Sequence, residues 1–395
     1  DLVERSARRR SPSCKNLTGQ QGAGWLVFNA SSRAAMRITV AQTDRTERFM
    51  TLLALAAAAA IQASGGPALT ITDFVGEVRI EPGAALAARV ERPDAESPVE
   101  IAETADGLVI DGGRTMRRWG CHGGWRQTRV GVNRRSARSF DELPLLIITT
   151  PDPAILELKD SIVRAAAPDL AAIDLELGAC GSVAAGDVAG DARIALSGSA
   201  DVTLGSVSGA ATVAISGSGD VALGDVTGAL SVALSGSGDV RAGSVGGADI
   251  SASGSGDAEI GDAAGALSVA LSGSGDVSAG GAGSLDARTT GSGDIEAGAV
   301  SGPVSFVSSG SGDLDLERLD GALTVSLGGS GDVRIDAGRA DPFQVRANGG
   351  GGVYFGGTAV NVAVRLSGGG DVRVSAVEGS QDVRISGGGD FEVGR

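Results

Sequence analysis

The sequence predicts an all-β protein built as a right-handed parallel β-helix, a solenoid of about 12 rungs with a period of about 19 residues, preceded by a short β-rich capping segment. Three observations support this fold class. A Gly-rich turn ending in Asp recurs through the second half of the chain, apolar and polar residues alternate after each copy, and another alternating segment precedes each copy. The 64 Gly do not recur at every third position and Pro is sparse, which excludes collagen.

The period is read from the Asp that closes each Gly-rich turn. These anchor residues return every 18 or 19 residues, apart from one double step. The double step contains a degenerate copy at Gly352, and Ser182 lies 19 residues before the first anchor Asp, which makes twelve anchors. The Asp anchors are Asp201, Asp220, Asp239, Asp257, Asp276, Asp294, Asp313, Asp332, Asp371 and Asp390.

Each anchor begins a predicted strand. After Asp239, for example, Val240 and Ala242 are apolar and Arg241 between them is polar, and nearly every copy repeats this alternation. Alternation with a period of two is the pattern of a half-buried β-strand. A second strand of the same kind, such as residues 232–234, precedes each anchor by five to seven residues. Because one 19-residue unit cannot bury its apolar face alone, we expect the units to stack into a continuous core.

Stacking places equivalent outward side chains one rung apart. Three of the resulting pairs carry opposite charges, and cross-strand pairs of this kind are worth about 0.2–1 kcal/mol each. We interpret them as structural. The pairs are Arg241 with Glu259, Asp315 with Arg334, and Arg373 with Glu392.

The anchor Asp residues form a row of like charges, which repel when they stack about 5 Å apart. One interpretation is that each carboxylate accepts hydrogen bonds from backbone N–H groups of the turn. The other is that the row provides oxygen ligands for Ca²⁺. The glycines of the Ser-Gly-Ser-Gly turns are expected to permit positive φ at the corner, and the stacked Ser hydroxyls to bond to each other or to the backbone.

Residues 64–148 lack the period, and the β-helix is expected over residues 149–395. An open end of a β-helix can template aggregation, so we expect residues 64–148 to cover that end. Short strands are predicted at residues 71–80, 87–92, 99–104 and 108–110, and strands leading into the β-helix at residues 145–150 and 155–158.

A basic loop spans residues 114–140 and contains eight Arg and no acidic residue. One interpretation is a contact loop for an anionic envelope polymer or a protein partner, with Arg and Trp side chains as anchors. The other is a flexible insertion whose Arg side chains pair with the acidic body. Cys121 and His122 alone are too few ligands for a metal site. The candidate contact residues are Arg117, Arg118, Trp119, Trp125 and Arg126, together with Tyr354, which the register of the repeats places on the outside.

The N-terminal part of the chain is not expected to belong to the folded domain. Residues 1–35 are interpreted as an upstream or non-native extension. Residues 36–63 resemble a secretory signal peptide, with three Arg, an apolar run at residues 49–61 and Ala63 at the cleavage position. The alternative is a transmembrane anchor, but the apolar run is shorter than the ~20 residues needed to cross a bilayer.

Removal of residues 1–63, which carry nine basic and four acidic residues, would change the net charge from −15 to −20. Such an acidic chain is not expected to have nucleic acid as its main partner, because phosphate binding requires a basic surface. Cys121 and Cys180 remain, and an exported protein can pair them. The sequence leaves open whether the two cysteines are paired or free.

A secretory signal, the segment Ile-Thr-Asp-Phe-Val-Gly-Glu-Val-Arg-Ile at residues 71–80 and repeated Ser-Gly-Ser-Gly-Asp together resemble the bacterial auto-transporter adhesin head GIN domain family. The resemblance covers about residues 70–395. It implies a right-handed β-helix exported across the inner membrane, with a role in adhesion. The sequence has no literal Gly-Ile-Asn and shows no C-terminal barrel-forming domain, so self-transport across an outer membrane is not expected.

The leading functional hypothesis is a non-catalytic exported protein that presents a repetitive acidic surface to cell-envelope or extracellular glycan polymers, in the periplasm, at the outer membrane or on the cell surface. Catalysis needs a position unlike its neighbours, whereas the acids repeat almost uniformly and the β-helix contains one Lys, Lys159, and no His. No catalytic, cofactor or metal residue is therefore predicted. The alternatives are a carbohydrate-active β-helix enzyme resembling polysaccharide lyases, and a structural protein that forms homo-oligomers through the ends of its β-helix.

Overall fold

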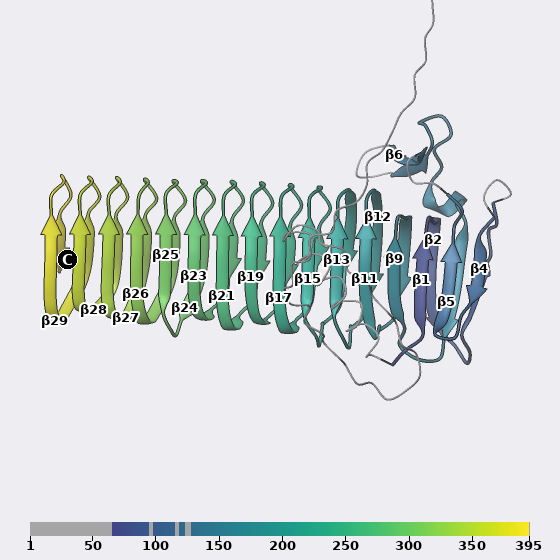
Figure 1. Ribbon diagram of the computed structural model, residues 1–395, viewed down its shortest axis with the longest axis horizontal. Helices are drawn as coiled ribbons and strands as arrows, with labels where there is room; N and C mark the ends of the chain where they lie inside the picture. The colour runs from purple at the N-terminus through teal and green to yellow at the C-terminus, as the bar shows by residue number, and fades with distance from the viewer. Residues whose placement is uncertain (1–64, 95–97, 115–117, 123–127, 395) are drawn as a thin grey trace, which may run out of the picture. The chain divides into compact units, whose positions relative to one another are not determined.

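The computed structural model describes residues 65–94, 98–114, 118–122 and 128–394 (Figure 1). The predicted extension and signal peptide lie outside these residues. The described part of the chain is a parallel β-solenoid of about 13 turns with a period of about 19 residues from about residue 155, which confirms the predicted fold class. Among the elements whose bounds lie within the described residues, the helical one is a short 3-10 turn, η2 (Phe140–Glu142).

Two sheets face each other across the core, and each is built from one strand segment per rung. The first sheet ends in the Gly-rich turns along one edge of the stack (Figure 1). In order along the stack, it contains β4 (Glu100–Glu103), β5 (Gly107–Asp111), β1 (Ala68–Thr72), β9 (Ile155–Lys159), β11 (Ala172–Leu177), β13 (Ala192–Leu196), β15 (Ala211–Ile215), β17 (Val226–Leu234), β19 (Val245–Ala252), β21 (Ala263–Leu271), β23 (Ala282–Thr289), β25 (Val304–Ser308) and the C-terminal halves of β26 (Leu314–Leu327), β27 (Val333–Ala347), β28 (Val353–Leu366) and β29 (Val372–Ile385).

The second sheet runs back from the Gly-rich turns. From β26 to β29 each strand continues around the opposite bend from the second sheet into the first. In order, the second sheet contains β3 (Ala87–Val90), β8 (Leu145–Thr150), β2 (Val75–Pro82), β10 (Ile162–Ala167), β12 (Cys180–Ala185), β14 (Ser199–Thr203), β16 (Val221–Ala222), β18 (Val240–Ala242), β20 (Ala258–Ile260), β22 (Val277–Ala279), β24 (Ile295–Val300), the N-terminal halves of β26 to β29, and β30 (Phe391–Val393).

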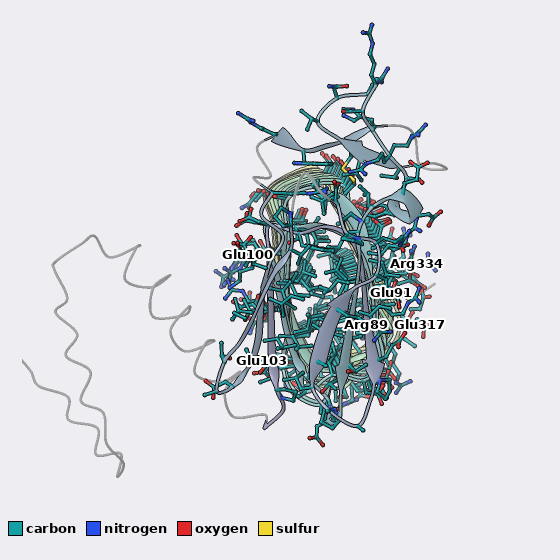
Figure 2. All side chains as sticks on the ribbon, turned by 90° about the vertical axis from the view of Figure 1, so that its right-hand side faces the viewer. Arg89, Glu91, Glu100, Glu103, Glu317 and Arg334 are labelled. Carbon is teal, nitrogen blue, oxygen red and sulfur yellow. A yellow bond between two sulfur atoms is a disulfide. The ribbon has the colours of Figure 1, made fainter. Side chains whose placement is uncertain are left out.

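The register of the stack is the one that the sequence period predicts. Val221 pairs with Val240, and Val240 pairs with Ala258, so residues one period apart lie side by side on neighbouring strands. The apolar residues of both sheets point inward and are almost fully buried, whereas the alternating polar residues point outward (Figure 2). This single continuous core is what holds the rungs together, because no rung buries its apolar face alone.

The N-terminal strands are threaded into the stack. The predicted strand over residues 71–80 is divided into β1 and β2 at Asp73, whose φ of 51° turns the chain from one sheet to the other. β1 lies between β5 and β9, and β2 lies between β8 and β10, all in parallel. Residues 68–82 therefore form a rung of the solenoid, so the stack begins well before residue 149 in the sequence.

The end of the stack nearest to this rung is closed by two antiparallel strands. β4 pairs with β5 at the edge of the first sheet, and β3 pairs with β8 at the edge of the second. Glu100 and Glu103 lie on one edge and Arg89 and Glu91 on the other (Figure 2). Short edge strands with charged side chains disfavour edge-to-edge pairing with other chains.

The glycines of the Gly-rich turns serve a different purpose from the one predicted. Positive φ is confined, among the described glycines, to positions outside the Ser-Gly-Ser-Gly turns. A Cβ added at either Gly of these turns would instead lie 1.8–2.1 Å from the backbone carbonyl oxygen of the rung below. The turns are therefore glycine-rich because adjacent rungs touch backbone to backbone. The stacked Ser hydroxyls make a few of the expected bonds, such as Ser292 to Ser274 at 3.4 Å.

No helix in the described residues has both the length and the apolar character needed to cross a membrane.

Three acidic residues meet where the first rungs turn from one sheet to the other. Partial burial raises the pKa of Asp73, and the negative charges of Asp111 and Asp160 raise it further. A carboxyl whose pKa is raised by folding opposes folding when it is ionised, and this penalty disappears as the pH falls through the raised pKa. The ionised Asp73 is therefore a local source of instability at neutral pH.

We expect Asp73→Asn to raise the melting temperature at pH 7, because the amide removes the charge while Asn tolerates the left-handed backbone at this position. The gain should shrink as the pH is lowered from 7 towards 4, because more of the wild-type carboxyl is protonated as the pH approaches its raised pKa. Thermal unfolding of both proteins across this pH range measures the effect. An equal gain at pH 4 and pH 7 would show that charge is not its cause.

Candidate functional site

The anchor Asp side chains form a hydrogen-bonded ladder along the edge of the stack. In each case the carboxylate Oδ1 accepts the backbone N–H of the next anchor, with distances of 2.7–3.2 Å. These bonds to each carboxylate offset the repulsion between like charges, which supports the structural interpretation of the row. The accepting residues are Asp201, Asp220, Asp239, Asp257, Asp276, Asp294, Asp313, Asp332 and Asp371.

The Ca²⁺ interpretation of the row stays a prediction for titration. Within the described ranges, no group of three or more His, Cys, Asp or Glu side chains is arranged to hold a metal ion.

The ladder has one gap, at Gly352. The Oδ1 of Asp332 accepts the backbone N–H of Gly352. Because Gly352 has no carboxylate, the ladder provides no acceptor for the backbone N–H of Asp371. The φ of Gly352 is not in the left-handed region, and the tightest contact of an added Cβ would be 3.0 Å. A side chain can therefore be placed here with a small adjustment.

We expect Gly352→Asp to stabilise the protein by about 0.5–1.5 kcal/mol, because it completes the ladder with one more hydrogen bond. Gly352→Ala is the matched control, since it adds the Cβ without an acceptor. Chemical denaturation of the three proteins provides the comparison. A gain for Ala as large as that for Asp would mean that backbone entropy, and not the carboxylate, explains the effect.

Two of the three predicted outward charge pairs form. Arg241 bonds to Glu259 at 2.9 Å, and Arg373 bonds to Glu392 at 2.7 Å. The third differs, because the guanidinium of Arg334 bonds to Asp336 on its own strand at 2.9 Å rather than to Asp315 on the neighbouring strand. Much of the outward charge on these strands is thus already paired within the protein.

The main irregularity of the molecule is the basic insertion, residues 112–144, which joins β5 to β8. Its described residues contain a small hairpin of β6 (Gly120–His122) and β7 (Arg129–Gly131), followed by η2. Val130, Phe140 and Leu143 of the insertion are buried against Val75 and Ile162 of the second sheet. This second, smaller core fixes the insertion to the side of the stack.

A disulfide also fixes the insertion to the stack. Cys121 in β6 is bonded to Cys180 at the start of β12, with a sequence separation of 59 residues. The question that the sequence left open is therefore answered in favour of pairing. A structural disulfide is typical of proteins that fold in an oxidising compartment.

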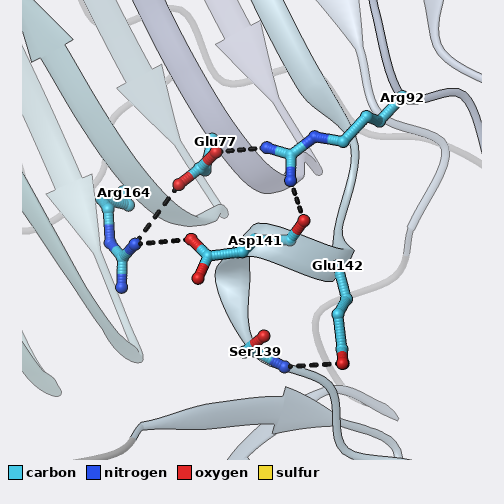
Figure 3. Close-up of polar contacts among 6 residues, drawn as sticks. All are labelled: Glu77, Arg92, Ser139, Asp141, Glu142 and Arg164. Atoms are coloured by element: carbon cyan, nitrogen blue, oxygen red, sulfur yellow. Dashed lines mark hydrogen bonds and ion pairs between the residues drawn. The ribbon is translucent and has the colours of Figure 1, made fainter.

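Charged contacts complete the attachment of the insertion, as Figure 3 shows. Glu77 on β2 lies between Arg92 and Arg164, and Arg164 also bonds to the carboxylate of Asp141 in η2 at 3.2 Å. Arg92 donates to the backbone carbonyl of Asp141. At the start of η2, the backbone N–H of the N-cap residue Ser139 donates to Glu142 at 3.2 Å. The insertion is thus held as a defined structure in its described parts.

Two Arg side chains of the insertion have structural roles. Arg114 is 4% exposed, forms an ion pair with Asp94 at 2.5 Å, and lies 4.4 Å from the ring centre of Trp119. Arg138 forms an ion pair with the same Asp94 at 2.6 Å. The half-buried Trp119 therefore packs against Arg114.

Four other Arg side chains of the insertion are exposed, and they have no ion-pair partner among the described residues. Val132, between two of them in sequence, is 53% exposed. We call these five residues the exposed basic patch. Its members are Arg118, Arg129, Val132, Arg134 and Arg135.

The structure places the predicted contact residues unevenly. Arg118 belongs to the exposed basic patch, whereas Arg117, Trp125 and Arg126 lie outside the described residues. Tyr354 is 39% exposed on β28 near the other end of the stack, 5.5 Å from the guanidinium of Arg334, and is not part of the insertion (Figure 1).

The sequence reasoning did not single out Arg129, Arg134 and Arg135. A local signal for the last two exists, because Asn133 begins a turn in which its Oδ1 accepts the backbone N–H groups of Arg135 and Ser136 at 3.0 Å. Asn-initiated turns place the residues that follow at the tip of a loop.

The comparison with protein families decides the relationship that the repeats suggest. The family model described as "Putative auto-transporter adhesin, head GIN domain" matches residues 146–299 and 299–395, together more than half of the chain. This chain belongs to the head GIN domain family. The match begins near β8, later than the expected start near residue 70. No curated protein and no solved structure matches the chain.

Membership of this family agrees with the solenoid fold and indicates an adhesin-like, exported or surface protein. The basic insertion, residues 112–144, lies before the matched region, which starts at residue 146. The match therefore covers the repetitive solenoid, and the insertion with its exposed basic patch lies outside the matched residues.

Proposed function

We propose that this chain is a non-catalytic, exported adhesin-like protein that binds an anionic glycan or other anionic cell-envelope polymer. The supporting observation is the exposed basic patch, whose four Arg side chains have no ion-pair partner among the described residues. Unpaired, exposed guanidinium groups are strong binding groups for carboxylates, sulfates and phosphates, because they donate paired hydrogen bonds to these groups.

The charge of the remaining molecule supports the same assignment. The solenoid is acidic, and its ladder carboxylates face outward along the whole stack. A polyanion is therefore repelled from the solenoid and attracted to the insertion at one end of it, so the polymer would meet the molecule in one place. The disulfide and the second core hold this patch in a fixed position, which limits the entropy lost on binding.

The repetitive face provides a second, weaker contribution in this proposal. Equivalent outward side chains recur at each rung, which suits many equal weak contacts with a repetitive partner. These contacts would act together with the patch and would not replace it.

Binding of the full chain to dextran sulfate, with neutral dextran as the reference polymer, tests the proposal. We expect binding to dextran sulfate alone, and a loss of about 10- to 100-fold in affinity when the salt concentration rises from about 50 to 200 mM. Changing the four Arg of the exposed basic patch to Gln should weaken binding by at least about tenfold.

The matched control also removes four positive charges, but from the solenoid, with Arg241→Gln, Arg318→Gln, Arg334→Gln and Arg373→Gln, and it should leave binding within about twofold. Equal losses for the patch and solenoid variants would assign binding to net charge and would contradict a site. Binding to neutral dextran as strong as to dextran sulfate would contradict an anionic ligand.

A further inference from the structure

The two ends of the stack differ in what they expose. The end formed by β3 and β4 carries charged edge strands. At the other end, the last described rung leaves the apolar core partly open. Val393 is 51% exposed and Ile385 is 45% exposed, while Val383 and Phe391 are partly buried against the core.

The edges of this last rung are also unpaired on their outer side in the described residues. The C-terminal half of β29 pairs with β28, and β30 pairs with the N-terminal half of β29, so each has one neighbouring strand. An edge with free backbone N–H and C=O groups beside apolar side chains is a site for the addition of another strand.

We propose that the last rung is a self-association surface, on which a second copy of this chain docks end to end about a two-fold axis. In this arrangement the first sheet of one copy continues into the first sheet of the other through antiparallel pairing of residues 381–385. The proposal does not depend on the anionic ligand, because the exposed basic patch lies at the other end of the molecule (Figure 1).

The charge pattern of residues 381–385 favours a second copy of this chain as the partner of the edge strand. When residues 381–385 pair antiparallel with themselves about Val383, Asp382 lies opposite Arg384 of the second copy, and Arg384 lies opposite its Asp382. Centring the pair on Asp382 or on Arg384 would place like charges opposite each other. The self-complementary register also brings the two Val383 side chains together, on the side of the sheet that faces the core.

In a single copy, the side chains of Asp382 and Arg384 are exposed and can form ion pairs with a second copy instead of with each other. Arg384 bonds to Asp382 along its own strand at 3.2 Å, and both side chains are more than half exposed. An exposed ion pair of this kind contributes little to stability, so exchanging it for two cross-strand pairs loses little. Opposite charges directly across an antiparallel pair are favourable, and like charges there are unfavourable.

Sedimentation velocity of the full chain over a wide concentration range tests the proposal. We expect the wild-type mass to double with rising concentration. Asp382→Arg alone and Arg384→Asp alone should each raise the dissociation constant by at least about tenfold, because each variant places like charges opposite each other twice.

An equimolar mixture of the two variants should restore the dimer, because every charge then faces an opposite one across the two copies. The double variant with both changes should dimerise like the wild type, and Arg89→Asp at the far end should have no effect. Circular dichroism checks that each variant is folded. A wild type that stays monomeric, or a mixture that stays as weak as its components, would overturn the proposal.

Discussion

Replacing Gly236 with Ala is expected to lower the free energy of unfolding by about 3 kcal/mol or more. The added Cβ would lie 1.8 Å from the carbonyl oxygen of Gly217 in the rung below, and a backbone atom cannot move aside as the end of a flexible side chain can. The two rungs would have to separate, which breaks the hydrogen bond from the N–H of Ser237 to the carbonyl of Gly217 at 2.9 Å. Chemical denaturation measures the loss.

Two controls separate this clash from a general sensitivity of the turns. Ser237→Ala changes the exposed residue next to Gly236. Gly369→Ala adds a Cβ in open space, at the position of a later turn that corresponds to Ser237. Both are expected to change stability by about 0.5 kcal/mol or less. A loss at Gly369 as large as at Gly236 would point to backbone strain in the turns and not to contact between rungs.

Removal of the disulfide is the second change with a large expected effect. Changing Cys121 and Cys180 to Ser should destabilise the protein by about 2–4 kcal/mol, because the bond closes a long loop and ties the basic insertion to β12. Thermal unfolding with and without reductant measures the effect. The wild type should lose stability in reductant, and the variant should not respond.

This result also bears on the proposed function. Because the exposed basic patch is fixed partly through this bond, the variant should bind dextran sulfate more weakly than the wild type even at temperatures where it is folded. A variant as stable as the oxidised wild type would show that the second core and the contacts of Glu77 alone hold the insertion.

The sequence was sufficient to predict the solenoid because its signal is both local and repeated. The alternation around Val240 alone would indicate a strand, but its return at Val221 and Ala258 fixes which strands are neighbours and in which register. The anchor Asp residues further indicate that the same Gly-rich turn connects the two sheets in each rung. Their hydrogen bonds to the next rung follow from this regularity.

The N-terminal region could not be predicted to the same depth because it lacks a period. Nothing in the residues near Asp73 indicates that β1 inserts between β5 and β9, since the partners lie far away in the sequence. The purpose of the turn glycines was missed for a related reason. Their crowding arises between rungs, and only the stacked structure shows it.

The candidate site was predicted as a basic loop with named contact residues, and of these Arg118 belongs to the exposed basic patch. The eight Arg residues and the absence of Asp and Glu identify residues 114–140 as a basic loop. Composition does not show which of these Arg side chains form ion pairs. Arg114 and Arg138 form ion pairs with Asp94, which precedes the loop in the sequence. The ring of Trp119 packs against Arg114. Exposure and pairing, which distinguish Arg134 from Arg114, depend on the tertiary structure.

The most direct test of the account measures distances along the stack. Spin labels at Thr212 and at one equivalent position per protein, Asp286, Ser305, Thr324 or Gln344, lie four, five, six and seven rungs apart by the observed register. Pulsed dipolar spectroscopy should give distances that increase by about 4.8 Å for each further rung. Distances that stay constant, or change irregularly with rung number, would contradict a stacked solenoid.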